Sequence, residues 1–450
     1  MRLSGSKFHF IGVGGIGMSG LAEVLHSIGA RVTGSDLSEN AQTERLRELG
    51  VQVFSGHAAH QVGEPDVVVY SSAVKADNPE YMEARRRRIP LIPRAEALAE
   101  IMRLKRGIAV AGTHGKTTTT SLLASTFLSE GMDPTIVVGG RLDTIRSTAL
   151  LGHGEWLVAE ADESDGSFAK LSPEIVIITN IDSDHLDHYK SFANLKQAFF
   201  DFAQRIPFYG LAVVCGDDPV NRDVFTQFPK RLLTYGFAED NDYILKKQGQ
   251  SYEVSHGGQV LGNFVPPIPG IHNALNCLAT IVVGKEVGLT FAQSAHGLAG
   301  FKGVDRRFQL KGERHGVLVY DDYGHHPTEV RAVLQAFREK YPDRRLMVAF
   351  QPHRYTRTQL CWQEFLHCFA GVDRLFLLDI YPAGEPPIEG ISSQSLAAQM
   401  CDVSVTAVGP VRTALPAIRA EFRSGDIFVT LGAGNGWQLG QEFLADGDLS

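Results

Sequence analysis

The segment that decides the fold of the central part of this 450-residue chain is Ile108-Ala-Val-Ala-Gly112-Thr-His-Gly-Lys116-Thr-Thr118. Its apolar run predicts a buried strand, its glycines a tight turn, and Ser121–Ala124 a helix that follows. This order forms a phosphate cradle, because backbone N–H groups and the helix N-terminus face the phosphate oxygens. Lys116 adds a full positive charge, and the Thr117 hydroxyl can ligate Mg²⁺. We therefore predict an ATP site in this segment.

The cradle departs from the general phosphate-loop pattern at one position. That pattern has a glycine six residues before the lysine, where this chain has Val110. The alternative interpretation is a glycine turn followed by a chance Lys-Thr pair. The flanking strand and helix favour ATP binding, since they are the context in which such a loop holds phosphate.

The composition is that of an ordinary globular protein with a formal net charge of −8. This charge argues against bulk attraction to nucleic acid or an anionic membrane, so neither partner is expected. The five cysteines are odd in number and have no metal-ligand spacing, which indicates reduced thiols. The N-terminus lacks a signal-peptide pattern, and no apolar run is long enough to span a bilayer. We expect a soluble cytoplasmic protein.

Strand-like and helix-like segments alternate along the chain, which predicts an α/β fold with parallel sheets. We divide the chain into three α/β units, residues 1–105, 106–303 and 304–450. Residues 242–262 differ, because short alternating segments and a Gly-Gly turn predict a small antiparallel meander. The other expected strands are Lys7–Ile11, Ala30–Thr33, Val51–Phe54, Asp66–Tyr70, Ile108–Ala111, Leu157–Ala159, Ile175–Ile178, Leu211–Val214, Val317–Tyr320, Leu346–Phe350, Leu375–Leu378 and Ile427–Leu431.

A second glycine motif, Gly12-Val-Gly-Gly-Ile-Gly17, lies between the first expected strand and a helix. It matches the dinucleotide-binding fingerprint, and Asp36 follows at the distance that would let it meet a ribose. Taken alone, the motif predicts an NAD-dependent dehydrogenase. Such glycines accept any nucleotide diphosphate, however, including a UDP group. The Lys-Thr cradle disfavours the dehydrogenase, which needs no ATP site.

Two polar segments follow strands of the central unit. In Glu160-Ala-Asp-Glu-Ser164, Glu160 is nearest the strand and is predicted to reach Mg²⁺, while the other polar residues are expected to be merely solvated. Thr179–His188 is dense in His and Asp, and we interpret it as catalytic without assigning each ligand. Zinc is the alternative, but no cysteine lies near and the spacing fits no zinc pattern.

In the last unit, Tyr320–Pro327 and Gln351–Arg357 follow consecutive strands. Their polar groups are therefore expected to converge on one crevice. Arg354 and Arg357 are suited to bind a carboxylate or phosphate through forked hydrogen bonds. An exposed loop is the alternative.

Taken together, and in this order, the motifs resemble the Mur ligase family. The short cradle with Val110 is that family's own form. The resemblance implies three domains: a Rossmann-like N-terminal domain, a central P-loop ATPase-like domain with a mostly parallel sheet, and a Rossmann-like C-terminal domain. The matching segments are Gly12–Met18, Gly112–Thr118, Glu160–Ser164, Asp184–Tyr189, His272–Asn276, Arg306–Phe308, Asp321–Pro327 and Gln351–Arg357.

The resemblance implies ATP-dependent ligation of L-alanine to the carboxylate of UDP-N-acetylmuramate in peptidoglycan precursor synthesis, with ATP and Mg²⁺ as cofactors. The carboxylate would take the γ-phosphoryl group of ATP, and the amine of alanine would attack the resulting acyl phosphate. The first domain would hold the UDP end, the second would bind ATP, and the third would help bind the amino acid and close over the site. A monomer or weak homodimer is expected.

The resemblance also implies roles for residues at the motif positions. The catalytic set is Lys116, His185, His325 and Arg354. ATP contacts fall to Gly112, Thr113, His114, Gly115, Lys116, Thr117, Thr118, Asn273, Asn276, Arg307 and Asp322. Substrate contacts fall to Gly12, Gly14, Gly15, Ile16, Gly17, Asp36, Ser71, Tyr323, His325, Arg354 and Arg357. The Mg²⁺ ligands would be Thr117, Glu160 and His185.

Other functions stay open at this stage. A sister ligase would attach a recycled murein peptide to the same UDP sugar, although the string Ile11–Ser19 favours the alanine-adding members. A non-catalytic nucleotide-binding regulator is disfavoured, because the metal and acceptor residues are all present. No single strong general base is evident, and His325 or a neighbour is the candidate for taking the ammonium proton of alanine.

Overall fold

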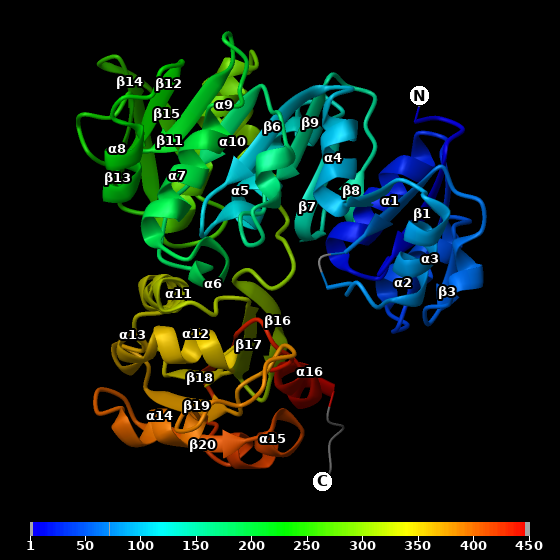
Figure 1. Ribbon diagram of the computed structural model, residues 1–450. Coiled ribbons are helices and arrows are strands. Elements are labelled where there is room, and N and C mark those ends of the chain that lie inside the picture. Colours follow the sequence, from blue (N-terminus) through cyan, green and yellow to red (C-terminus); the bar gives the residue numbers. More distant parts are fainter. Residues whose placement is uncertain (1–2, 72, 446–450) are drawn as a thin grey trace. The chain divides into compact units, whose positions relative to one another are not determined.

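The computed structural model describes residues 3–71 and 73–445. The chain divides into two compact units, the first comprising Met1–Pro267 and Leu275–Lys302 and the second Ile268–Ala274 and Gly303–Ser450. Each unit is an α/β structure (Figure 1). Throughout residues 3–71 and 73–445, every helix is too short or too polar to cross a bilayer.

The N-terminal part of the first unit is a five-stranded parallel sheet in the order β3-β2-β1-β4-β5. The strand order reverses between β1 and β4, and such a switch point, beyond the carboxyl ends of the strands, is where open α/β sheets bind ligands. The strands are β1 (Lys7–Ile11), β2 (Arg31–Asp36), β3 (Gln52–Ser55), β4 (Val67–Tyr70) and β5 (Leu91–Pro93). The helices are α1 (Ile16–Ser27), α2 (Ala41–Glu48), α3 (Pro79–Arg87) and α4 (Arg94–Met102).

The rest of the first unit is built on a ten-stranded sheet in the order β15-β14-β13-β12-β11-β10-β6-β9-β7-β8. Its central strands are parallel, while β7 with β8 and the meander β13–β15 are antiparallel. The predicted meander is thereby confirmed. The strands are β6 (Arg106–Ala111), β7 (Thr135–Leu142), β8 (Ser147–Leu150), β9 (Trp156–Glu160), β10 (Ile175–Ile178), β11 (Leu211–Cys215), β12 (Leu232–Gly236), β13 (Tyr243–Gln248), β14 (Ser251–His256) and β15 (Gln259–Phe264). The helices are α5 (Lys116–Ser129), α6 (Leu186–Tyr189), α7 (Phe192–Ala203), α8 (Pro219–Phe225), α9 (Ile271–Glu286), whose first residues up to Ala274 belong to the second unit, and α10 (Phe291–Ala299).

Helix α5, which follows the phosphate cradle, is enclosed on all sides. Every residue from Thr117 to Phe127 is buried. Helix α10 packs closely on it, since a Cβ on Gly297 would lie 2.7 Å from the Cα of Thr126. Because the helix is fixed between the sheet and α10, the residues at its N-terminus are held in place.

The second unit has a six-stranded sheet in the order β16-β17-β21-β18-β19-β20. Only the edge pair β16–β17 is antiparallel. Alternate residues of β18 enter different cores, Val348 on one face and Met347 on the other, so both faces of the sheet are covered. The strands are β16 (Gln309–Arg314), β17 (Val317–Asp322), β18 (Leu346–Phe350), β19 (Arg374–Leu378), β20 (Val405–Gly409) and β21 (Ile427–Leu431). The helices are α11 (Pro327–Lys340), α12 (Tyr355–Leu360), α13 (Trp362–His367), α14 (Ser393–Gln399), α15 (Val411–Arg419) and α16 (Gln438–Ala445).

The predicted α/β class is confirmed, and each strand expected from the sequence is present with small shifts at its ends. The structure adds strands that the sequence analysis did not anticipate, namely β5, β7, β8, β12, β16 and β20. Of these, β5, β8, β16 and β20 are edge strands, and β5, β16 and β20 contain no fully buried residue, so their apolar pattern is weak.

Candidate active site

Two glycines of the phosphate cradle need both their backbone angle and their lack of a side chain. Gly112 has φ +134° and Gly115 has φ +82°, values that favour glycine. A Cβ on Gly112 would lie 1.9 Å from Oγ1 of Thr179, and one on Gly115 would lie 3.0 Å from Oδ1 of Asn276. The cradle therefore packs directly against neighbouring polar side chains.

The end of β10 holds the cradle in shape. The side-chain oxygen of Asn180 accepts a hydrogen bond from the His114 N–H at 2.8 Å, and its carbonyl accepts one from the Thr113 N–H at 3.0 Å. The His114 ring is paired with Asp182, with 2.8 Å between Nε2 and Oδ2. This part of the polar segment Thr179–His188, which the sequence analysis interpreted as catalytic, thus supports the cradle.

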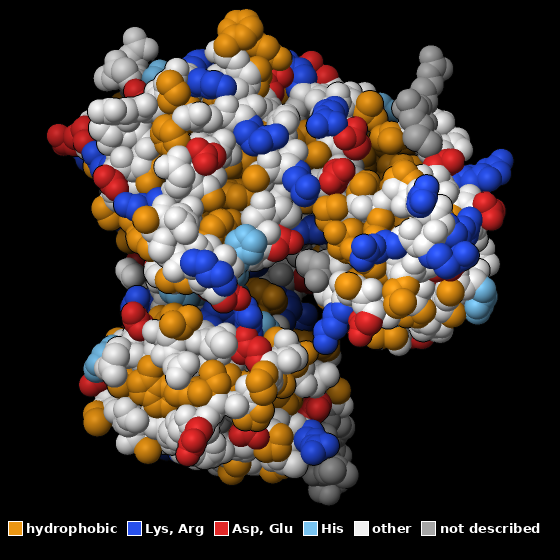
Figure 2. Space-filling view, viewed as in Figure 1, with side chains coloured by type: hydrophobic (Ala, Val, Ile, Leu, Met, Phe, Trp, Pro, Cys, Tyr) orange, Lys and Arg blue, Asp and Glu red, His pale blue; other side chains and the backbone are white. Residues whose placement is uncertain are grey.

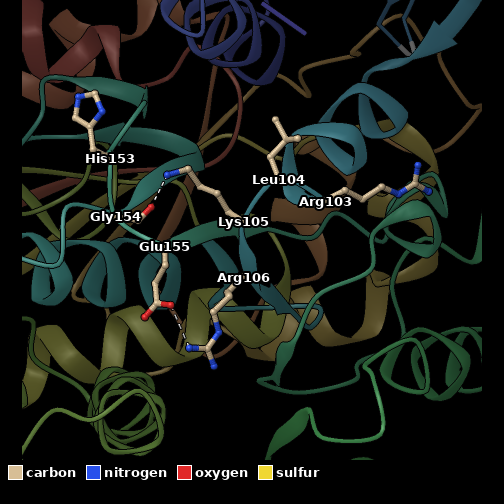
Figure 3. Close-up of a pocket in the computed structure, with 7 residues that line it drawn as sticks. All are labelled: Arg103, Leu104, Lys105, Arg106, His153, Gly154 and Glu155. Carbon is tan, nitrogen blue, oxygen red and sulfur yellow. Dashed lines mark hydrogen bonds and ion pairs between the residues drawn. The ribbon is translucent and has the colours of Figure 1, made fainter. Parts of the chain in front are cut away.

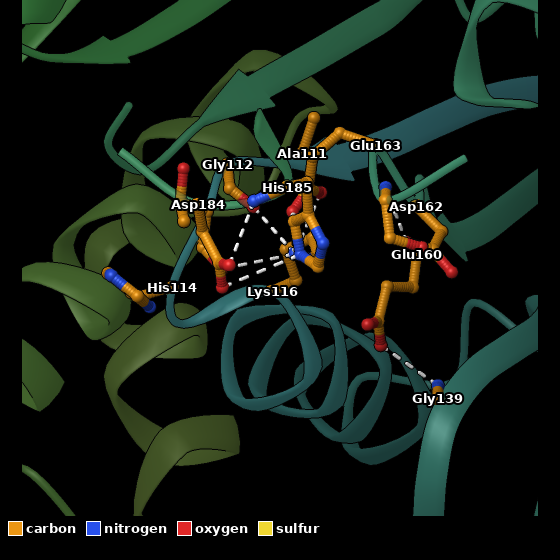
Figure 4. A network of polar contacts seen from close by, with 12 residues as sticks. Ala111, Gly112, His114, Lys116, Gly139, Glu160, Asp162, Glu163, Asp184 and His185 are labelled. Atoms are coloured by element: carbon orange, nitrogen blue, oxygen red, sulfur yellow. Dashed lines mark hydrogen bonds and ion pairs between the residues drawn. The ribbon is translucent and has the colours of Figure 1, made fainter. Parts of the chain in front are cut away.

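Lys116 folds back onto the loop that precedes it. Its Nζ donates to the carbonyl of Gly112 at 2.7 Å, to that of Thr113 at 3.1 Å and to Glu163 at 2.8 Å (Figure 4). Burial alone would lower the pKa of Lys116, but the neighbouring carboxylates, Glu163 foremost, raise it overall. The ammonium group therefore stays charged in the cradle.

Thr117 and Glu160, two of the predicted Mg²⁺ ligands, lie in direct contact. The Thr117 hydroxyl donates to Oε2 of Glu160 at 2.9 Å, and the Gly139 N–H donates to the same oxygen at 2.9 Å. Figure 4 shows Glu160 reaching from the end of β9 to Gly139 on β7. These residues place a hydroxyl and a carboxylate, both hard oxygen donors, beside the cradle.

The expectation that Glu163 is merely solvated is wrong. Its side chain is fully buried because it pairs with Lys116 of the cradle, and the Tyr189 hydroxyl donates to its backbone carbonyl at 2.6 Å. Burial raises the pKa of Glu163 to about 7, although Lys116 opposes the rise. Nε2 of His185, the third predicted Mg²⁺ ligand, lies 3.7 Å from the Glu163 carboxylate. The structure thus joins Lys116, Glu163 and His185 in one cluster.

The first glycine motif forms the loop between β1 and α1, at the point where the strand order reverses. Gly14 is held from both sides, since its N–H donates to Oδ2 of Asp36 at 2.8 Å and its carbonyl accepts from Nδ2 of Asn40 at 3.2 Å. Gly12 has φ +81°, and a Cβ there would lie 3.3 Å from that of Ser71 after β4. Asp36 therefore shapes the loop, and Asn40 is a contributor that the sequence analysis missed.

In the second unit, charged groups gather at the end of β17. Asp322 is buried and accepts hydrogen bonds from the N–H groups of Phe308 and Gly324, both at 2.7 Å. Burial raises its pKa to about 6, against the opposing charge of Arg307. The Tyr323 ring faces two guanidinium groups, with its centroid 5.1 Å from Cζ of Arg306 and 5.2 Å from that of Arg307.

The predicted residues His325, Arg354 and Arg357 each have a defined partner in the second unit. The His325 N–H donates to Glu329 at 3.0 Å, and Nη1 of Arg357 lies 3.3 Å from Nδ1 of His353. The rings of His325 and His353 are 5.8 Å apart, centroid to centroid, so the loops after β17 and β18 come together although β21 lies between the two strands.

Arg354 has φ +70°, and its Nε donates to Glu385 at 2.6 Å. Glu385 also accepts from the N–H and the hydroxyl of Thr356, at 3.0 and 2.7 Å. The sequence analysis did not anticipate this carboxylate, which lies in a loop remote from every motif. Arg354 is therefore already paired with an acid in this structure.

Asn273 and Asn276, predicted to contact ATP, lie in the first part of α9 and are both buried. Nδ2 of Asn273 donates to the carbonyl of Pro269 at 2.8 Å. Asn276 is the residue against which Gly115 of the cradle packs. Of the two predicted residues, Asn276 is thus the one that lies at the cradle itself.

A separate cavity of about 420 Å³ lies elsewhere in the first unit (Figure 3). Its basic groups are engaged by the protein: Nζ of Lys105 donates to the Gly152 carbonyl at 2.8 Å, and Arg106 is paired with Glu174 at 2.6 Å. Because these groups are already paired, the cavity offers no concentrated positive charge. On the face drawn in Figure 2, basic and acidic side chains are also interspersed. The residues that line the cavity are Arg103, Leu104, Lys105, Arg106, His153, Gly154 and Glu155.

The fold and these contacts define an α/β protein with an ATP-type phosphate cradle and a second glycine loop at a sheet switch point. Residues 7–106 match the family description "Mur ligase family, catalytic domain", residues 110–284 match "Mur ligase middle domain", and residues 306–434 match "Mur ligase, glutamate ligase domain". The chain belongs to the Mur ligase family, and its middle domain implies that it uses ATP. The resemblance inferred from the motifs is confirmed, and the dehydrogenase interpretation is wrong.

Individual relatives agree with this assignment. The chain is 61% identical to the UDP-N-acetylmuramate–L-alanine ligase of Bdellovibrio bacteriovorus, over 99% of both chains. It is 52% identical to the enzyme of that name from Geobacter sulfurreducens, over 98% of this chain and 97% of the other. The solved structure of the UDP-N-acetylmuramate-alanine ligase of Thermotoga maritima is similar with a TM-score of 0.81, 30% identity and 98% coverage of both chains. A murein peptide ligase from Psychrobacter arcticus, with a TM-score of 0.74 at 22% identity over 98% of both chains, shares the fold.

Proposed function

We propose that this chain joins L-alanine to the carboxylate of UDP-N-acetylmuramate, with ATP converted to ADP and phosphate, in peptidoglycan precursor synthesis. The observation that carries this proposal is the 61% identity, over 99% of the chain, to a ligase with that name. The relatives with that name at 50% identity or more favour alanine over a recycled peptide as the acceptor.

The reaction needs ATP because a carboxylate is a poor electrophile. Transfer of the γ-phosphoryl group to a carboxylate oxygen breaks the P–O bond to ADP and gives an acyl phosphate. The amine of alanine then attacks the acyl carbon, and phosphate leaves with the electron pair of the broken C–O bond. The two anions repel each other, so positive charge must be concentrated where they meet. Lys116 is suited to supply that charge, because the raised pKa of its ammonium group keeps it protonated in the cradle.

The residues beside the cradle fit a Mg²⁺ ion. The oxygens of Thr117 and Glu160 are the kind of donor that Mg²⁺ prefers, and they already lie 2.9 Å apart. We propose that these two residues and His185 hold the ion. It would neutralise charge on the phosphate oxygens.

We propose that the three family segments act as domains with boundaries near residues 105 and 303. Residues 1–105 would bind the UDP end, through Gly12, Gly14, Gly15, Ile16, Gly17, Asp36 and Ser71. The middle domain would bind ATP through the cradle, with Asn273 and Asn276 on the adenine side, and Arg307 and Asp322 of the C-terminal domain would add further ATP contacts. The C-terminal domain would hold alanine and the acidic groups of the substrate through Tyr323, His325, Arg354 and Arg357.

The ammonium group of alanine must lose a proton before it can attack. His325 is our candidate for the group that takes it. Its ring Nδ1 lies 3.5 Å from the Glu329 carboxylate, which would stabilise the imidazolium form. ATP and nucleotide sugars are metabolites of the cytoplasm, so we propose that the protein acts there.

The test is ADP release by the purified full-length chain with UDP-N-acetylmuramate and a panel of acceptors. We expect release with L-alanine, and little or none with the tripeptide acceptor of the sister ligase. Release that depends on the tripeptide and not on any single amino acid would contradict the proposal.

A further inference from the structure

Arg94 lies directly against the first glycine loop. It begins α4, and a Cβ built on Gly17 would lie 2.4 Å from its Nη1 and 3.1 Å from its Cζ. Gly17 is the second residue of α1, where any residue can adopt the backbone angles. The absence of a side chain at Gly17 therefore leaves room for the guanidinium group in the position that it occupies here.

The start of helix α1, which Arg94 contacts at Gly17, carries partial positive charge; the acids nearby are Asp162, which pairs with Arg94, and Asp36, which accepts from the Gly14 N–H. Helix α1, which lies wholly in the described part of the chain, has no acidic residue in its first turn, and its N-cap residue Gly15 makes no capping hydrogen bond through a side chain. The N–H groups of a first turn carry partial positive charge. A cation placed against them raises the electrostatic energy of the empty site, and a bound anion lowers it again.

The ion pair that Arg94 makes within the protein is a long one. Its Nη2 lies 3.5 Å from Oδ2 of Asp162, and the Arg94 side chain is 30% exposed. Other arginines of this chain pair more closely with their acids: Arg45 with Glu23 at 2.6 Å and Arg374 with Glu421 at 2.7 Å. Since a guanidinium group has five N–H donors, Arg94 keeps hydrogen-bonding capacity for an oxyanion.

The topology brings Arg94 to the same edge of the sheet as the glycine loop. The glycine loop follows β1, whereas α4 follows β5, and β4 lies between these two strands. The switch point thus has the backbone N–H groups of the glycine loop and the Arg94 guanidinium group beside each other, in contact at Gly17.

We propose that Arg94 is a substrate-binding residue that holds the diphosphate of a nucleoside diphosphate sugar against the first turn of α1. This inference rests on the function proposed above, which places the UDP group in this loop. A guanidinium group can donate two parallel hydrogen bonds to two phosphate oxygens. The negative charge of the diphosphate would neutralise both the charge of the arginine and the partial charge of the helix N-terminus.

The experiment measures binding of uridine, UDP and UDP-N-acetylmuramate to the full-length chain and its Arg94→Gln and Arg94→Lys variants by titration calorimetry. We expect Arg94→Gln to weaken binding of UDP and of the UDP sugar alike, by about 10- to 100-fold. Arg94→Lys should lose less UDP affinity than Arg94→Gln, because lysine keeps the positive charge but lacks the paired N–H donors of the guanidinium group. The affinity for an ATP analogue should stay within about twofold.

Arg103→Gln is the matched control, because Arg103 lies at the other end of α4 and pairs with Glu100. It should bind UDP like the parent chain. Unchanged UDP affinity in Arg94→Gln would overturn the proposal, and so would loss restricted to the UDP sugar, which would assign Arg94 to the sugar carboxylate. A combined loss of UDP binding, ATP binding and thermal stability would indicate a structural role and overturn it too. A parent chain that binds ATP but neither UDP nor its sugar would instead refute the proposed function.

Discussion

The ammonium group of Lys116 lies 2.8 Å from the carboxylate of Glu163, and the Glu163 side chain is fully buried. A buried ion pair is costly to desolvate and adds little net stability, but losing one partner leaves an uncompensated charge. The pair is therefore better explained as a device that keeps the cradle lysine in place. The first two predictions therefore vary Lys116 and Glu163.

Replacing Lys116 with Met should abolish turnover, because the charge that meets the γ-phosphate is gone, while leaving UDP binding largely intact. The two phosphate-binding loops lie in different family segments, which is why the losses should separate. Turnover is measured by ADP release and UDP binding by calorimetry. Lys170→Met, which removes an exposed lysine paired with Glu96 at 3.3 Å, is the control. Equal loss of both properties in Lys116→Met would argue against separate sites.

Glu163→Gln should change how stability depends on pH. The pKa of Glu163 is raised to about 7, above its ordinary value of 4.5, so the native state favours the neutral acid. The contribution of Glu163 is thus complete below pH 4.5 and is lost as pH rises towards 7, by an amount on the order of 3 kcal/mol. Urea unfolding between pH 5 and 8, without nucleotide or Mg²⁺, should show a flatter profile for the variant. Parallel profiles for variant and parent would contradict this account.

Gly14→Ala should destabilise the first glycine loop. The new Cβ would lie 2.9 Å from Oδ2 of Asp36 and from Nδ2 of Asn40, so the loop or both side chains must shift, at a cost of about 1–3 kcal/mol. Gly15→Ala is the matched change, since its Cβ would meet nothing closer than 3.6 Å. Chemical denaturation should therefore separate the two variants. If Gly15→Ala lowered the free energy of unfolding as much as Gly14→Ala, the argument from crowding at Gly14 would be refuted.

Thr117→Val should lower kcat by about 10- to 100-fold, because it removes the hydroxyl that contacts Glu160 and is proposed to ligate Mg²⁺. Thr117→Ser keeps that hydroxyl and should retain most of the activity. Steady-state ADP release over a range of Mg²⁺ concentrations measures both variants. If Thr117→Val and Thr117→Ser lowered kcat equally, the loss of activity would come from changed packing in the enclosed helix and not from loss of the hydroxyl.

The sequence was most informative where local chemistry and periodicity agree. Buried strands such as Leu346–Phe350 are continuous apolar runs, and the glycine loops carry their own turn signal. Glu163 could not be told from its solvated neighbours, because its burial depends on Lys116 from a different strand–helix unit. Asn40, Glu385 and Arg94 were missed for the same reason, since their roles come from contacts with residues distant in the chain.

The central claim is that the carboxylate of the sugar nucleotide is activated by phosphoryl transfer. It is tested most directly with UDP-N-acetylmuramate carrying ¹⁸O in its carboxylate, incubated with the full-length chain, ATP, Mg²⁺ and L-alanine. Mass spectrometry of the released inorganic phosphate should find one ¹⁸O atom per phosphate, because a carboxylate oxygen leaves with the phosphoryl group. Phosphate free of ¹⁸O, formed alongside the amide product, would contradict the account.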